Sequence, residues 1–183
     1  PYEKLEDDVE VEKIGREFRR HFTDLKEKLM PIRVYIETGR YLVGKAGLYV
    51  TKVRDKKVSH GKTIVILSNT LNGFYRPSIS QMISNYTQEK NPVPTEPLFT
   101  SYNSTQIGVI KENEEKETVT LMGNLCTAMD VIAKDIELPK LEIGDIVIMN
   151  NAGSYSYVLT PLQFASLEKP KEIVISCEGK SIE

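Results

Sequence analysis

The sequence predicts a mainly β protein in which one helix and one strand precede a domain of short strands. Two observations support this fold class. The N-terminal part contains a helical repeat of apolar residues followed by a β-branched run. After about residue 47, short strand-like runs alternate with turn signals and no long helical pattern intervenes. This order indicates an all-β sandwich or barrel that follows an α/β unit.

The N-terminal helix is predicted from apolar residues at steps of three and four, with charged residues between them. They are Val11, Ile14, Phe18, Phe22, Leu25 and Leu29. Pro31 lies just past the last of them, where a helix must stop. The next run, Ile32 to Ile36, is β-branched and aromatic and predicts a strand. In α/β units ligands collect at the strand's C-terminal end, which here is Glu37-Thr38-Gly39-Arg40.

Six short runs predict the strands of the β-domain: Leu48 to Val53, Thr63 to Leu67, Gln106 to Ile110, Thr118 to Met122, Ile146 to Met149 and Ile173 to Ser176. Turn signals separate them, as in Ser59-His60-Gly61-Lys62 and Ile143-Gly144-Asp145. Residues Ile79 to Tyr86 have the pattern of a short helix.

Composition excludes several classes of protein. The 183 residues are 40% hydrophobic and 27% charged, as in an ordinary globular protein. A net charge of -2 provides no basic surface for nucleic acid or an anionic membrane. No apolar stretch is long enough to span a membrane, and no signal peptide is visible. Two cysteines are too few for a disulfide framework, so we expect a cytoplasmic protein.

The N-terminal α/β unit is incomplete by itself. Parallel-type strands need neighbouring strands and covering helices, and one helix and one strand cannot supply them. The chain also begins with Pro1 and not with Met. We therefore expect further barrel sequence upstream.

Three segments, in this order and spacing, resemble a known family: Glu37-Thr38-Gly39-Arg40, Gly123-Asn124-Leu125-Cys126-Thr127-Ala128-Met129-Asp130 and Ala152-Gly153-Ser154-Tyr155. The family is that of the fold-type III pyridoxal-phosphate (PLP)-dependent decarboxylases, the group of diaminopimelate, ornithine and arginine decarboxylases. A fourth segment, Asn72 to Pro77, contains an Arg-Pro pair that the family often has in this region. The resemblance covers nearly the whole chain.

The resemblance implies a Greek-key β-sandwich or barrel that follows the last helix and strand of a TIM-type α/β barrel. On this basis, residues 1–46 are the C-terminal fragment of the PLP-binding barrel and residues 47–183 are the β-domain. The implied cofactor is pyridoxal 5'-phosphate, and the implied reaction is α-decarboxylation of an amino acid through an external aldimine. The family forms head-to-tail homodimers whose subunits share their active sites.

Four residues match the family's cofactor contacts. Glu37 would face the pyridine nitrogen and keep it protonated, because an opposite charge nearby favours the charged form. Gly39 would let the backbone approach the phosphate, and Arg40 would bind the phosphate as a bidentate donor. Tyr155 would reach the phosphate with its hydroxyl. From position alone, Glu37 could instead be a strand-end residue in solvent or in a salt bridge, and Tyr155 could be a half-buried core residue.

Cys126 matches the family's catalytic cysteine, which comes from the partner subunit and acts as a positioned acid. Glu37 is the second residue to which the resemblance assigns a catalytic role. Asp130 closes the cysteine motif. It belongs to the expected substrate-binding loop, and its carboxylate could hold that loop through hydrogen bonds to the backbone. The other cysteine, Cys177, is expected to be a small hydrophobic residue.

Thr127 departs from the diaminopimelate and ornithine enzymes, which have an acidic residue here that binds the substrate's distal ammonium. A neutral hydroxyl cannot pair with that charge, so we expect a different substrate. Relatives with Thr at this position resemble the butirosin-type enzyme, whose glutamyl substrate is linked to a carrier protein, and siderophore-pathway decarboxylases. Arg76 resembles a contact to the substrate carboxylate, or it is a surface charge. The family's preceding Asp-Gly-Gly is Ser68-Asn69-Thr70 here.

The family's Schiff-base lysine stands in a Tyr-Ala-x-Lys setting that the 183 residues do not contain. We therefore expect this chain alone to be inactive. Two alternatives differ from a decarboxylase: a non-catalytic, decarboxylase-like regulator that binds a partner protein, and a free-standing β-domain that acts as a binding module.

Overall fold

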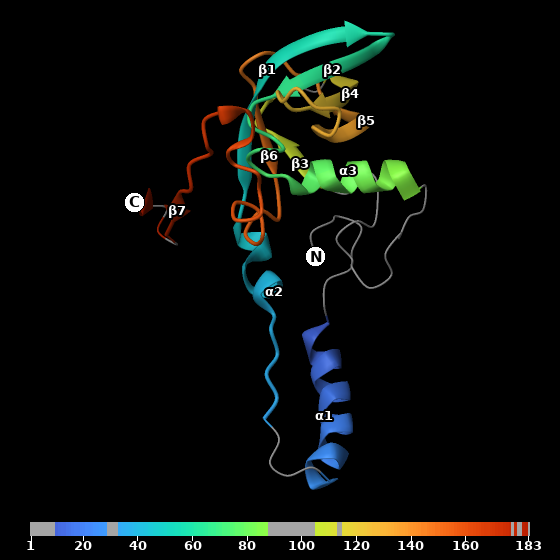
Figure 1. The fold of residues 1–183 in the computed structure, drawn as a ribbon, viewed down its shortest axis with the longest axis vertical. Helices are drawn as coiled ribbons and strands as arrows, with labels where there is room; N and C mark the ends of the chain where they lie inside the picture. The colour runs from blue at the N-terminus through green and yellow to red at the C-terminus, as the bar shows by residue number, and fades with distance from the viewer. Residues whose placement is uncertain are drawn as a thin grey trace.

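The computed structural model describes residues 10–28, 33–87, 105–112, 115–176, 178 and 181–182 (Figure 1). Within these ranges the main body is a six-stranded sheet with the strand order β3-β6-β1-β2-β4-β5. The strands are β1 (Tyr49–Ser59), β2 (Lys62–Leu67), β3 (Ile107–Val109), β4 (Lys116–Met122), β5 (Val131–Pro139) and β6 (Ile146–Met149). The β2–β4 pair is parallel and the other pairs are antiparallel. The sheet curls into a nearly closed barrel, so the expected β-domain is confirmed.

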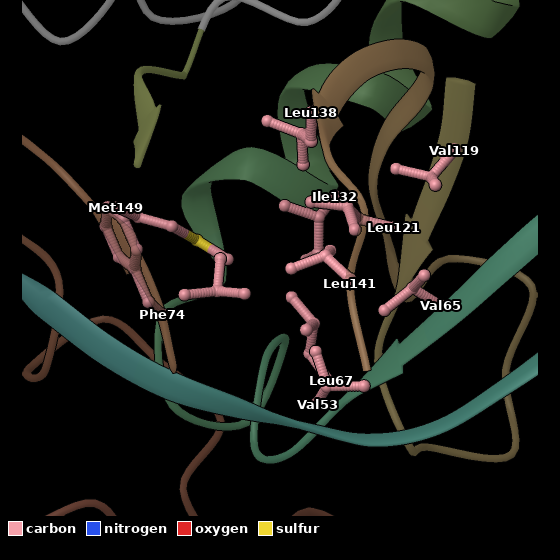
Figure 2. Close-up of a cluster of buried hydrophobic side chains, with 11 residues drawn as sticks. Val53, Val65, Leu67, Phe74, Val119, Leu121, Ile132, Leu138, Leu141 and Met149 are labelled. Carbon is pink, nitrogen blue, oxygen red and sulfur yellow. The ribbon is translucent and has the colours of Figure 1, made fainter. Parts of the chain in front are cut away.

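Alternation along the strands builds the core. In β1, Thr51 and Val53 are buried while Val50, Lys52 and Arg54 are exposed, as expected when successive side chains point to opposite faces. Buried side chains from five strands and two loops meet inside the sheet, as Figure 2 shows. They are Val53, Val65, Leu67, Phe74, Val119, Leu121, Ile132, Leu138, Leu141, Val147 and Met149. This packing fixes the positions of the loops at the ends of the strands.

Five of the expected strands are present in the sheet, and β5 is the strand that the sequence pattern missed. Its first three residues, Val131 to Ala133, are all buried, so the two-residue period is absent there. Asp135 then adopts a positive φ of 50°, beside an irregular register with β4. Its charged residues also lower its apparent strand propensity. The sixth predicted run forms β7 (Val174–Ile175), which pairs with β8 (Ser181–Ile182) outside the main sheet.

Helix α1 (Val11–Lys28) confirms the predicted N-terminal helix and stands apart from the sheet (Figure 1). The strand predicted over residues 32–36 is not present: residues 33–38 have no helix or strand, and Ile32 lies outside the described residues. A strand is stabilised by hydrogen bonds to a neighbouring strand. The described residues provide none at this segment, where Tyr35 is 80% exposed.

The described residues also form two shorter helices and two 3-10 turns. Helix α2 (Gly39–Val43) runs directly into the 3-10 turn η1 (Gly44–Ala46), and a second 3-10 turn, η3, spans Phe164–Ser166. Helix α3 (Arg76–Thr87) includes the predicted short helix and packs on β5, where Gln81 donates a hydrogen bond to the carbonyl of Ile132 (3.3 Å). None of the helices in the described part of the chain has the length and apolar character needed to cross a membrane.

Candidate active site

The structure brings together two segments that are far apart in the sequence, namely α2 with η1 and the 152–155 loop that follows β6. The amide of Ala152 donates to the carbonyl of Gly47 (2.9 Å), and the amide of Gly153 donates to the carbonyl of Gly44 (3.0 Å). Two of the three motif segments therefore form one unit next to the start of β1.

The two segments cross where Gly47 meets Gly153, and these two glycines allow the close contact. A Cβ on Gly47 would lie 2.2 Å from the amide nitrogen of Gly153, and a Cβ on Gly153 would lie 1.8 Å from the carbonyl oxygen of Val43. Both distances are far below van der Waals contact, and the opposing atoms are backbone atoms that cannot rotate away. The crossing thus requires a glycine at each of these positions.

The expected phosphate-binding residues lie at this crossing. The Cγ of Arg40 and the Oγ of Ser154 lie 3.6 and 3.7 Å from the position that a Cβ of Gly44 would occupy, so these two side chains flank the same point. Tyr155 follows Ser154, is 53% exposed and has a φ of 53°. A left-handed backbone is unfavourable for tyrosine. Such strain is most common where a side chain must point in a particular direction.

Glu37 and Gly39 lie at the exposed edge of the same unit. Gly39 is the first residue of α2, and Glu37 lies two residues before it in the segment without regular structure. Both are exposed. Tyr155 is not fully buried in the core and the side chain of Glu37 is accessible to a ligand, while the cofactor contacts of both residues stay predictions.

The Cys126 loop, residues 123–130, lies between β4 and β5. Cys126 is a free, exposed cysteine, whereas Asp130 is fully buried. The carboxylate of Asp130 accepts hydrogen bonds from the amides of Leu71 (3.0 Å) and Leu125 (3.1 Å), and from the hydroxyl of Thr70. Asp130 therefore holds the loop, and its oxygen atoms face the protein interior. Thr127, which is half-buried, accepts a long hydrogen bond from the amide of Met129 (3.3 Å).

Two residues of this region were missed by the sequence reasoning. Thr70 is 1% exposed and bonds to Asp130. Tyr49, at the start of β1, places its hydroxyl against Gly73, where a Cβ would lie 2.0 Å from it. Burial raises the pKa of Tyr49 far above its usual range, and the nearby charge of Asp130 raises this pKa further. The only signal in the sequence was Thr70 itself, which replaces an expected glycine.

Arg76 is not a surface charge, because it is only 5% exposed. It is the first residue of α3, and its guanidinium carbon lies 5.8 Å from the centre of the Tyr75 ring. This distance is within the range of a cation–π contact. The surface-charge interpretation was therefore wrong, while contact with a substrate stays a prediction.

Comparison with known proteins places these features in a family. The family model "Pyridoxal-dependent decarboxylase, C-terminal sheet domain" matches residues 34–153. The chain is 30% identical over 177 residues to the L-glutamyl-(BtrI acyl-carrier protein) decarboxylase of Niallia circulans, covering 95% of this chain and 38% of that protein. It is 27% identical over 186 residues to the diaminopimelate decarboxylase of Methanothermobacter thermautotrophicus, covering 98% of this chain and 37% of that protein.

A solved structure confirms the fold. The diaminopimelate decarboxylase of M. jannaschii, in complex with L-lysine, superposes with a TM-score of 0.76 at 24% identity, over 98% of this chain and 36% of that one. The chain spans little more than a third of the length of these relatives. Since the family model covers most of the chain, from the α2 segment to the Gly47–Gly153 crossing, the chain belongs to the pyridoxal-dependent decarboxylases and forms their C-terminal sheet domain.

Proposed function

We propose that this chain supplies cofactor-binding and proton-donating residues to a PLP-dependent decarboxylase that removes the α-carboxyl group of an amino acid. The observation that carries the proposal is the glycine crossing, which joins the Arg40 segment to the Tyr155 loop. Arg40 alone or Tyr155 alone would not indicate a phosphate site. A guanidinium and an exposed phenol on two joined segments do indicate one.

The residues present fit the cofactor. At the crossing, Arg40 offers charge-assisted donors to a phosphate, Tyr155 offers a hydroxyl, and the two glycines keep the backbones free of side chains. Glu37, accessible beside α2, would keep the pyridine nitrogen of the cofactor protonated. When bound, PLP supplies the electron sink for the electron pair that remains as carbon dioxide leaves.

Cys126 returns the proton after the carboxyl group has left. Its thiol is exposed at the tip of a loop that is anchored from inside, which suits a group that must reach a neighbouring surface. We propose that this surface is the cofactor site of a second copy of the protein, so that two subunits share each active site. The exposure of both Cys126 and Glu37 supports this arrangement.

The substrate lacks a simple distal ammonium group. The residue after Cys126 is Thr127, and the two exposed residues that follow, Ala128 and Met129, are also uncharged. A loop tip without an acidic group offers no partner for a distal cation, and leaving such a cation unpaired would be costly. The similarity to a decarboxylase of a carrier-protein-linked glutamyl group supports a substrate of that kind, an aminoacyl group attached to a carrier protein.

The test is a carbon dioxide release assay on the protein that joins this chain to its cofactor-binding barrel, loaded with PLP. Carrier-linked glutamate, free diaminopimelate and free ornithine are compared at equal concentration. We expect turnover of the carrier-linked substrate and little of the free diamino acids. A Thr127→Glu variant should improve the use of free diaminopimelate. Faster turnover of free diaminopimelate by the unaltered protein would overturn the substrate proposal.

The same preparation tests cofactor binding. We expect Arg40→Ala to weaken binding of PLP by about tenfold or more, because a charge-assisted bidentate contact is lost, as measured by the absorbance of the bound cofactor. The exposed Arg33, which lies upstream of the α2 unit, provides the matched control, and Arg33→Ala should bind PLP normally. A protein that binds no PLP at all would favour the non-catalytic regulator.

A further inference from the structure

The turn after β2 makes an unexpected contact with the Cys126 loop. Its residues Ser68-Asn69-Thr70 replace the Asp-Gly-Gly that the family resemblance leads one to expect. Thr70 therefore supplies a side chain at a position where the family pattern has a glycine. It is 1% exposed, and its hydroxyl donates a hydrogen bond to the Oδ1 atom of Asp130. A buried hydroxyl bonded to a carboxylate is among the stronger neutral–charged contacts.

Further hydrogen bonds join the same turn and loop. The amide of Leu71 donates to the Oδ1 of Asp130 (3.0 Å), and the amide of Asn69 donates to the Oδ1 of Asn124 (3.1 Å). The other carboxylate oxygen of Asp130, Oδ2, accepts from the amide of Leu125 (3.1 Å). The residue immediately before Cys126 is thereby bonded to the carboxylate that Thr70 holds.

The turn and loop meet at Gly123. A Cβ on Gly123 would lie 1.6 Å from the Oγ1 of Thr70 and 1.9 Å from the Oδ2 of Asp130. The Thr70 side chain therefore fills the space over this glycine. At the base of the loop, the amide of Gly123 donates to the carbonyl of Asp130 (2.8 Å), whereas the amides of Asp130 and Met129 donate to Thr127 at 3.3 Å each. The bonds around Thr127 are long, so this part of the loop depends on Asp130 and on the contact of Asp130 with the turn.

We infer that Thr70 is a positioning residue, which acts through Asp130 and Leu125 to fix the position of the Cys126 thiol. This inference rests on the proposed function only in giving Cys126 its catalytic role. The contact itself belongs to this chain, because it comes from a residue that the family pattern does not provide. Loss of the Thr70 hydroxyl should loosen the Cys126 loop while the sheet stays folded.

A spin label on Cys126 tests the inference directly. Cys177→Ser leaves Cys126 as the sole thiol of the chain, and a nitroxide attached there reports the mobility of the loop in an electron paramagnetic resonance spectrum. Thr70→Val keeps the shape of the side chain and removes the hydroxyl, and we expect it to shorten the rotational correlation time by about twofold or more. Thr70→Ser retains the hydroxyl and should restore the original spectrum.

Thr118→Val is the matched control, because Thr118 is exposed on β4. Its label spectrum should equal that of the unaltered chain. If Thr70→Val does not fold by circular dichroism, Asn124→Ala takes its place, since the half-buried Asn124 holds the outer end of the same contact. An unchanged spectrum in a folded Thr70→Val or in Asn124→Ala would overturn the inference.

In the active protein, we expect Thr70→Val to lower kcat by about tenfold with KM nearly unchanged, because a misplaced acid slows the proton return and leaves substrate binding intact. Thr70→Ser should recover kcat. The two hypotheses fail differently. If the label becomes mobile in Thr70→Val but the unaltered protein decarboxylates nothing, the proposed function alone is refuted. If the label stays immobile in Thr70→Val and the unaltered protein is an active enzyme, the positioning role alone is refuted.

Discussion

Asp130 shows how a single side chain can organise a loop from the inside. Its fully buried carboxylate accepts hydrogen bonds from Thr70, Leu71 and Leu125. Hydrogen bonds to the charged form are what make a buried carboxylate tolerable. The sequence motif indicated this residue, but only the structure shows that two of its partners, Thr70 and Leu71, lie in a turn about sixty residues earlier.

Replacing Asp130 should destabilise the fold. Asp130→Ala leaves two buried amides and a hydroxyl without their acceptor, and each such group has a large desolvation cost. We expect the free energy of unfolding to fall by about 3 kcal/mol, measured by urea denaturation. Glu137→Ala, at an exposed position of β5, should change it little, since the ion pair of Glu137 with Lys116 is at the surface. Equal effects of the two variants would contradict the role given to Asp130.

Gly153 tests the crossing of the two phosphate-site segments. Gly153→Ala places a methyl group 1.8 Å from the carbonyl oxygen of Val43, so the segments must separate. We expect a loss of about 2–4 kcal/mol in the free energy of unfolding or a local opening of the crossing, together with weaker PLP binding. Gly108→Ala on β3 meets no atom within 4 Å and should be tolerated. Tolerance of Gly153→Ala would show that the crossing is not tight.

Asp145 links pH to stability. Its hydrogen bond with the Lys111 ammonium (2.8 Å) lowers the pKa of this carboxyl below its ordinary value. A carboxyl whose pKa is lower in the folded state contributes stability above its unfolded pKa, and loses that contribution as pH falls through its folded pKa. Asp145→Asn should therefore lower the melting temperature near neutral pH and have almost no effect at about pH 2. The same decrease at both pH values would contradict the assignment.

Among the described elements, helix α1 and the segment 33–38 have apolar side chains that no other described residues cover. Val11, Ile14 and Phe18 are 46%, 54% and 37% exposed on one face of α1. The rings of Phe18 and Phe22 stack with centroids 4.6 Å apart. An apolar stripe of this kind normally packs against other elements. The absence of a strand at residues 33–38 has the same cause, because strand hydrogen bonds need a neighbour.

We expect the isolated chain to self-associate through the apolar face of α1. Phe18→Glu places a charge on that face and should shift the chain towards a monomer, whereas Arg20→Glu on another face of the helix should not. Light scattering coupled to gel filtration measures the difference. A monodisperse monomer of the unaltered chain would contradict this expectation.

The elements that the sequence predicted correctly are those with regular patterns. The alternation in β1 and the β-branched run of β6 indicated strands, and the three-and-four spacing indicated α1. The pattern failed at β5, where Val131, Ile132 and Ala133 are all buried and the two-residue period is absent. It also failed at residues 33–36, where local propensity favours a strand but the described residues form none.

At the scale of the whole molecule, one continuous set of contacts connects the site segments. The curled sheet carries the Cys126 loop, and the start of β1 lies next to the crossing of α2 with the 152–155 loop. The motifs indicated candidate site residues, whose roles stay predictions. They could not predict the Thr70–Asp130 contact or the Gly47–Gly153 crossing, because both depend on distances between segments that only folding brings together.

The proposed active site combines Arg40 of one subunit with Cys126 of another. Mixing the Arg40→Ala and Cys126→Ala variants of the barrel-containing protein, at a PLP concentration too low to load Arg40→Ala, tests this arrangement, because a mixed dimer has one site with both residues intact. Random exchange of subunits in a symmetric dimer predicts recovery of about a quarter of the unaltered activity. If mixed dimers form, as shown by mass spectrometry, and decarboxylation does not recover, the shared active site is contradicted.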